Sequence, residues 1–315
     1  MPTQITSLTF CAFDLETTGY DPTEVRICEF AASRFKLDYD GSALVPCHLD
    51  GSDSLTYHKL SDPGVPIPPE ASGAHNLRDE DVATALPEDM QVEEFIKKMR
   101  GTVWLAHNAA YDYETLVHAL MRARKCSEQE ARTELFNAHV GVIDTLRLAR
   151  HLVPTENHKL NTLFHYYGCP RANAPTHRAD DDVRALVDVF QGLVGTCLEG
   201  FAKDWPITED DPGLSPNFCD ELFSTSYSPV DYGRINFGKH RNDALEEVPF
   251  SYFDWWINKR RAEDQPDWDR EYTMAGLAKQ AGVNPDKCDR IQAAARQRLA
   301  GELQAFYPTL TVEPA

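Results

Sequence analysis

The order of the predicted secondary-structure elements is the feature that most constrains the fold of this chain. Residues 8–15 form an apolar run, and residues 25–37 alternate β-branched, aromatic and small side chains, so both segments are predicted as strands. Further along, short apolar runs at 103–106 and 140–143 predict two more strands. Helical periodicity covers residues 88–99, 109–124, 127–137, 145–152, 159–167 and 179–198. Strands followed by alternating helices and strands predict an α/β fold with a mixed sheet and helices on its faces.

Two proline-bearing stretches interrupt this pattern. Residues 62–70 (DPGVPIPPE) predict an ordered surface loop, since proline is excluded from helix interiors and central strands. Residues 204–218 are acidic and aperiodic, which is typical of a linker. We therefore expect a large domain over residues 1–200, a linker over 201–228 and a small α+β domain over 229–315. The small domain has an aromatic stretch at 237–256 and a helical tail at 271–305.

Composition limits the cellular setting and the partners. The 315 residues carry a formal net charge of −19, which argues against a polyanionic partner because proteins that hold phosphates usually present Lys and Arg to them. Basic residues are nevertheless grouped at 122–125 and 259–261. The eight cysteines are scattered, which predicts buried thiols in a reducing compartment. No apolar run approaches the ~20 residues that span a bilayer, so we expect a cytoplasmic protein without membrane contact.

Two carboxylates close the first predicted strand. Asp14 and Glu16 are two positions apart, and since side chains alternate along a strand, both point to the same face. Two adjacent anions repel each other unless a cation lies between them, so this pair is a candidate half-site for a metal ion. An exposed acidic pair at a strand end is the alternative interpretation, and this motif alone does not decide between the two.

A third carboxylate follows the strand at 103–106. His107 and Asn108 end that strand, and a helix then begins with Asp112 near its first turn. Asn108 can cap this helix, and Asp112 can simply complement the helix dipole. Ligands of mixed α/β sheets nevertheless gather at the carboxyl ends of strands, where Asp112 is expected beside the first acidic pair.

The third motif is HRADDD at residues 177–182. His177 and Asp182 are five positions apart, about 140° around a helix, so they do not share a helical face. If the helix begins near residue 179, however, His177 lies on the preceding loop and Asp182 projects from the first turns, and both can face one site. Asp180 and Asp181 are predicted to complement the helix dipole.

Taken together, these segments resemble a known family. FDLETTG (13–19), HNAAYDYETL (107–116) and HRADDD (177–182) resemble, in order, the three motifs of the DEDDh exonuclease superfamily, and the match covers about the first 200 residues. The resemblance implies a ribonuclease H-like fold with a mixed five-stranded sheet and a 3′-to-5′ exonuclease activity. PIPPEASGAHNL (66–77) also resembles the substrate loop of this family, although Asn76 stands where many relatives have glycine.

The resemblance further assigns roles to individual residues. Four acids, Asp14, Glu16, Asp112 and Asp182, would bind two divalent ions, and Mg²⁺ or Mn²⁺ suits such an all-oxygen site. His177 would take the proton from the attacking water, which requires a neutral imidazole and predicts activity falling below about pH 6.5. The candidates for binding the terminal nucleotide are Thr17, Thr18, Gly19, His75, Leu77, His107 and Asn108.

A shorter resemblance lies beyond the predicted linker. Residues 235–240 (INFGKH), together with Val248, Pro249, Tyr252 and Trp255, are similar to the small accessory domain that ends exodeoxyribonuclease X. Basic and aromatic residues of this kind bind nucleic-acid strands by charge and stacking. Residues 255 and 256, two consecutive tryptophans, can equally form a hydrophobic core.

Three functions follow as hypotheses. The first is a DNA exonuclease that releases nucleoside monophosphates from single-stranded 3′ ends. The second is an RNA 3′-end trimming enzyme, because the same constellation of residues serves ribonuclease T and oligoribonuclease. The third, from a different class, is a non-catalytic nucleic-acid-binding or scaffold protein, which would explain the acidity but would not require four carboxylates and a histidine.

Overall fold

The computed structural model describes residues 5–40, 43–49, 55–201, 216–235, 237–241, 243–259 and 267–306. The chain divides into two compact units, which we call unit 1 (Met1–Ser226) and unit 2 (Tyr227–Ala305). No described helix combines the length and the apolar character needed to cross a membrane.

Unit 1 contains the mixed sheet that the sequence predicts. Its strands are β1 (Phe10–Thr17), β2 (Ile27–Tyr39), β3 (Leu44–His48), β4 (Tyr57–Asp62), β5 (Leu86–Pro87), β6 (Thr102–Ala106) and β7 (His139–Asp144). The order is β5-β4-β2-β1-β6-β7, with β3 paired to β2. Strand β1 runs antiparallel to β2 and parallel to β6, which is parallel to β7. The predicted α/β class is therefore confirmed.

The number of strands differs from the expected five. The sheet has seven, because the 13-residue β2 is long enough to pair with β4 near its start and with β3 near its end. Strand β5 has only two residues and pairs with β4 at the edge of the sheet. Segments as short as β3, β4 and β5 carry little hydrophobic periodicity, so sequence patterns do not reveal them.

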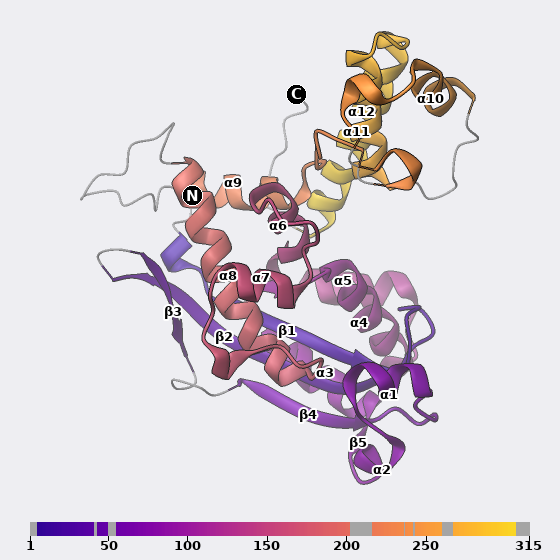
Figure 1. Ribbon diagram of the computed structural model, residues 1–315. Coiled ribbons are helices and arrows are strands. Elements are labelled where there is room, and N and C mark those ends of the chain that lie inside the picture. Colours follow the sequence, from indigo (N-terminus) through magenta and orange to yellow (C-terminus); the bar gives the residue numbers. More distant parts are fainter. Residues whose placement is uncertain are drawn as a thin grey trace. The chain divides into compact units, whose positions relative to one another are not determined.

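Helices cover both faces of this sheet. The helices of unit 1 are α1 (Pro69–His75), α2 (Asp79–Val82), α3 (Glu88–Met99), α4 (Ala109–Arg124), α5 (Glu128–Phe136), α6 (Thr145–Leu152), α7 (Leu160–Tyr166), α8 (Ala179–Phe201) and α9 (Pro216–Tyr227). On one face, Phe13 and Phe30 pack with residues of α3 and α4 in the main hydrophobic core. On the other face, Phe10 packs against Phe190 of α8, the long helix that crosses the sheet in Figure 1.

Two loop predictions are corrected. Residues 62–70 are not entirely loop, because α1 begins at Pro69, and proline is tolerated in the first turn of a helix where its missing N–H is not needed. Residues 216–227, assigned to the linker, form the helix α9 within unit 1 apart from its last residue. The remainder of the acidic stretch, residues 202–215, lies outside the described residues.

Unit 2 is helical in its described part. It comprises the short turns η3 (Gly238–His240) and η4 (Leu245–Glu247), α10 (Phe250–Asp254), the π-helical turn η5 (Trp255–Lys259), α11 (Trp268–Gln280) and α12 (Pro285–Phe306). The expected α+β character is wrong for these residues, since none of them forms a strand. Pro249 and Gly238, with a φ of 65°, break the aromatic stretch into helical turns. The predicted single helical tail is two helices, separated near Gly282 with a φ of 82°.

Candidate functional site

Three of the predicted carboxylates meet at the end of β1. Asp14 and Glu16 share a face of β1 with Phe10, which is the face covered by α8. Asp182 projects from the first turns of α8, and carboxylate oxygens of the three residues all lie within 4.8 Å of one another. The alternation along β1 and the start of α8 thus produce the convergence that the sequence predicts.

The fourth carboxylate, Asp112, enters from the first turn of α4 and is buried. It is not part of the three-residue group, but its negative charge raises the pKa of Asp14. The preceding residue holds the helix in place, because the Tyr111 hydroxyl donates to the carbonyl oxygen of Gly19 at 2.7 Å. The start of α4 is therefore tied to the segment that follows β1.

The folded protein disfavours the state in which all four of these acids are ionised at once. Burial, followed by repulsion from Glu16 and Asp112, raises the pKa of Asp14 well above its ordinary value. Burial and repulsion from Asp182 raise the pKa of Glu16 to about 9. Burial also raises the pKa values of Asp112 and Asp182. A set of oxygen ligands in this state fits a hard divalent cation such as Mg²⁺ or Mn²⁺, whose charge would compensate the carboxylates.

His177 lies on the loop before α8, as expected. The backbone N–H groups of Thr176 and His177 donate to Asp182 Oδ1 at 3.0 and 3.2 Å, which fixes this loop against the helix start. His177 has a left-handed backbone conformation, with a φ of 58°, and its side chain is exposed. The loop therefore presents an imidazole to solvent beside the acidic group.

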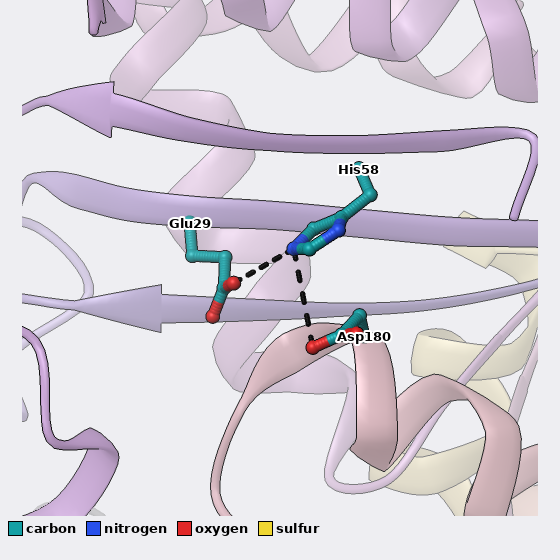
Figure 2. A group of neighbouring side chains, drawn as sticks. All are labelled: Glu29, His58 and Asp180. Atoms are coloured by element: carbon teal, nitrogen blue, oxygen red, sulfur yellow. Dashed lines mark hydrogen bonds and ion pairs between the residues drawn. The ribbon is translucent and has the colours of Figure 1, made fainter. Parts of the chain in front are cut away.

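A second cluster, centred on Glu29 of β2, holds the start of α8. Glu29 is the cross-strand partner of Glu16, so both side chains share a face of the sheet. Although its side chain is fully buried, Glu29 accepts two hydrogen bonds from Arg178, at 2.7 and 3.0 Å, and one from the Ala179 N–H at 3.1 Å. His58 Nε2 donates at 2.8 Å to the same carboxylate and lies 3.9 Å from Asp180 (Figure 2).

This cluster fixes the start of α8, and the positive charge that its buried acid needs comes from an arginine and not from a metal ion. Burial alone would raise the pKa of Glu29, but the hydrogen bonds from His58, Arg178 and the Ala179 N–H outweigh it and lower that pKa to about 2. Glu29, His58 and Asp180 are ligand types for an ion, yet the Arg178 guanidinium already supplies the positive charge. Glu29 therefore connects β2 to the helix start that carries Asp182.

The residues predicted to bind the terminal nucleotide near β1 make internal contacts. Thr17 is buried, and its hydroxyl lies 2.9 Å from the Gly19 carbonyl oxygen and 2.7 Å from the Tyr111 hydroxyl. The Thr18 hydroxyl accepts a hydrogen bond from the N–H of Arg26 at 3.0 Å. These contacts shape the turn after β1. The hydroxyl groups of Thr17 and Thr18 therefore hold the backbone of this turn in place.

His75 and Leu77 are also internal. His75 is only 2% exposed; its Nδ1 accepts from the Leu77 N–H at 3.1 Å, so its Nε2 is the donor to the Thr17 carbonyl oxygen at 3.2 Å. Leu77 packs in a small core beneath α1 and α2. Between them, Asn76 ends α1 with a φ of 58°, a conformation that glycine and asparagine both adopt, which explains how Asn76 replaces glycine in this loop.

His107 and Asn108 precede α4. His107 Nδ1 lies 3.1 Å from the Thr145 hydroxyl, and burial lowers the pKa of His107 to about 4, so this imidazole is neutral. Asn108 is exposed and has a φ of 77°, and its side chain does not cap α4, which corrects the capping expectation. Its N–H instead donates to Asp144 Oδ1 at 3.1 Å.

Sequence reasoning missed several residues that build this site. Asp144, which is buried at the end of β7, caps α6 and raises the pKa of Asp112. The sequence does not decide whether Tyr111 packs in the core or faces the terminal nucleotide, and it does not predict the Glu29 cluster. A signal was present for Glu29, because an acid inside the apolar run of a strand needs a buried cationic partner.

The fold and the acidic site define an α/β protein with a group of carboxylates at the end of a central strand. Residues 11–190 match the RNase_T family, described as exonuclease, and the chain belongs to this family. Its enzyme class is that of the 3′-to-5′ exonucleases. The resemblance noted from the motifs is thereby confirmed.

Curated relatives extend this comparison. The chain is 29% identical over 189 residues to DNA polymerase III subunit epsilon of Treponema pallidum, covering 59% of this chain and 76% of that protein. It is 30% identical over 195 residues to a DNA polymerase III subunit epsilon-like protein of Rhodobacter capsulatus, covering 61% of this chain and 24% of that protein. A PolC-type DNA polymerase III of Listeria innocua is 29% identical over 156 residues, 49% of this chain and only 9% of its own length.

Solved structures share less sequence identity with this chain than these relatives do. Exonuclease X in complex with 5′-overhanging duplex DNA aligns with 68% of this chain and 99% of its own, at 19% identity and a TM-score of 0.39. A 3′-exonuclease bound to a histone mRNA stem-loop aligns with 59% of this chain and 63% of its own, at 14% identity and a TM-score of 0.43.

Proposed function

We propose that unit 1 removes nucleoside monophosphates from the 3′ end of DNA with the help of divalent ions. One observation carries this proposal: the carboxylates of Asp14, Glu16 and Asp182 converge within 4.8 Å at the end of a central strand, with Asp112 buried nearby. Raised pKa values in such a group indicate a site that is completed by a cation.

These four acids would hold two Mg²⁺ or Mn²⁺ ions. Such ions polarise the scissile phosphate, lower the pKa of the attacking water and stabilise the leaving 3′-oxygen. The protein's own contribution is geometric. Glu29 fixes the start of α8, and the Tyr111 hydroxyl fixes the start of α4, so the acids of both helices are held against β1.

His177 would act as the general base. Its exposed imidazole is carried by a loop whose backbone is bonded to Asp182, and it can therefore accept the proton of a water bound at the acidic group. His107 is an unsuitable alternative, because its Nδ1 contacts Thr145 and burial lowers its pKa to about 4.

The substrate is a nucleic-acid strand with a free 3′ end, and single-stranded DNA is the favoured form. Relatives named as epsilon subunits of DNA polymerase III support DNA over RNA. An RNA 3′-end trimming activity is the alternative, and the same assay separates the two, because only RNA presents a 2′-hydroxyl to the pocket.

A time course with matched 5′-labelled single-stranded DNA and RNA tests this function in Mg²⁺. We expect a ladder that shortens from the 3′ end, faster on DNA, and its loss in Asp182→Asn. Asp181→Asn is the matched control, since Asp181 neighbours Asp182 but pairs with Arg184 and Thr176 outside the metal group. Binding without cleavage in Mg²⁺ and Mn²⁺ would instead identify a non-catalytic nucleic-acid-binding protein.

A further inference from the structure

Unit 2 carries a cluster of aromatic and basic side chains on η3, α10 and η5. Tyr252 is at its centre: its ring stacks on Trp255, with centroids 6.1 Å apart and planes at 30°, and its centroid lies 4.6 Å from that of His240. Lys239 Nζ lies 5.7 Å from the Tyr252 centroid. We call Lys239, His240, Tyr252 and Trp255 the aromatic-basic surface.

The two consecutive tryptophans have different environments. Trp256 is 8% exposed and packs in the core of unit 2, where its ring lies 5.0 Å from that of Phe237. Trp255 is 44% exposed, and Phe250, on the same helical segment, is also exposed. Trp255 is not among the described residues of this core, and the exposed part of its ring is available for contact with a partner.

Unit 2 has a smaller negative net charge than unit 1, which favours the binding of an anionic partner to unit 2. Residues 227–305 contain 12 Lys and Arg against 13 Asp and Glu, whereas residues 1–226 contain 19 against 36. Within the described ranges, neither Lys239 nor Arg241 has a carboxylate partner, so both charges are available to phosphates. The basic group predicted at 259–261 lies mostly outside the described residues.

We propose that the aromatic-basic surface binds single-stranded nucleic acid, with a base stacked on Trp255 and a neighbouring phosphate at Lys239. Aromatic rings beside cations bind single strands in this way, while the base faces of a duplex are already stacked. A protein partner is disfavoured, because interface cores are depleted of charge and this surface is not. The inference rests on the proposed nuclease function, since the bound strand would be the one whose 3′ end unit 1 shortens.

Fluorescence anisotropy of the full chain in EDTA tests this proposal without cleavage. The probes are labelled oligothymidylate and oligouridylate of about 16 nucleotides, the upper site size of a single-strand-binding domain. We expect Trp255→Ala to weaken binding about tenfold or more, and Trp255→Phe to retain most of the affinity, because one stacked base is lost only in the alanine variant. Lys239→Ala should lower the slope of log affinity against log salt by about 0.7.

Tyr166→Ala is the matched control, because Tyr166 on α7 is 49% exposed and belongs to unit 1. The proposal is overturned if Trp255→Ala binds as tightly as wild type, or no more weakly than Tyr166→Ala. It is equally overturned if sedimentation shows that Trp255→Ala abolishes self-association while the affinity for both probes is unchanged. A circular dichroism melt of each variant checks folding, and Lys239→Ala provides an independent charge test.

Hydrolysis of the p-nitrophenyl ester of thymidine 5′-monophosphate separates this inference from the proposed function. This ester is too small to extend beyond the acidic site, so Trp255→Ala should hydrolyse it as wild type does. An inactive chain that still shows Trp255-dependent strand binding would refute the nuclease proposal alone. An active chain whose strand binding ignores Trp255 and Lys239 would refute only the role of unit 2.

Discussion

Replacing Arg178 by methionine should destabilise unit 1 and do so in a pH-dependent way. The change removes the guanidinium but keeps most of the apolar stem, and it leaves the fully buried Glu29 with only His58 and the Ala179 N–H as partners. Removing one partner of a buried ion pair costs about 3 kcal/mol at the low end of measured values, which suits an arginine that is 33% exposed. For a unit of this size, that corresponds to a fall in Tm of about 6–12 °C.

The sign of the pH effect follows from the pKa of Glu29. In the wild type this pKa is lowered to about 2 from an ordinary value of 4.5, so the carboxylate contributes stability that is present above pH 4.5 and is lost as the pH falls toward 2. Without Arg178, its hydrogen bonds and its charge no longer lower the pKa of Glu29 against the effect of burial, so the variant loses much of the stability that the ionised carboxylate contributes above pH 4.5. The difference in Tm between wild type and variant should therefore be large at pH 7 and shrink toward pH 4.

Thermal melts followed by circular dichroism at pH 7 and pH 4 measure this difference. Arg184→Met is the matched control on the same helix, because Arg184 forms partly exposed pairs with Asp180 and Asp181 that are worth about 1 kcal/mol or less. The reasoning is refuted if Arg178→Met melts no lower than Arg184→Met at pH 7. It is also refuted if the loss in Tm is independent of pH.

Three further predictions concern the acidic site. The Tm of the metal-free protein should fall as the pH rises from about 5 to 9, and Mg²⁺ should restore it. The reason is that the folded state binds more protons than the unfolded one, because the pKa of Glu16 is raised to about 9. A Tm in EDTA that does not change with pH, or an equally steep dependence of Tm on pH in Asp14→Asn, would contradict this. His177→Asn should lower kcat about 10²-fold or more, because the general base is lost, and an unchanged kcat would exclude His177 as the base. Tyr111→Phe should cost about 1 kcal/mol of unfolding free energy, measured by urea denaturation, because the hydrogen bond to the Gly19 carbonyl is lost; no change in the urea midpoint would show that this bond does not tie α4 to β1.

The sequence predicted elements with strong periodicity and clear ends. Helices α3, α4 and α6 have the expected bounds, because each combines an apolar face with a marked start or end. The acids of β1 and α8 were found because strand alternation and helix starts place side chains by local rules. In contrast, α1 begins within a proline run, and β4 is short and polar, so their patterns are weak.

Long-range partnerships could not be read in this way. The apolar run around Glu29 shows that this acid needs a partner, but Arg178 lies 149 positions further along the chain. Similarly, the sequence does not distinguish Trp255 from Trp256, because a π-helical turn decides which ring enters the core. Tertiary packing, rather than local propensity, settles both cases.

The left-handed backbone at His177 affects which variants can report on its chemistry. In this conformation the Cβ of an ordinary residue crowds the following carbonyl oxygen, at a cost of about 1–2 kcal/mol, while asparagine adopts it readily. An alanine scan would therefore merge two phenotypes at this position, a distorted loop beside Asp182 and a missing imidazole. Only asparagine or glycine isolates the second, and a saturation library at position 177 should rank variants by backbone tolerance before it ranks them by side-chain chemistry.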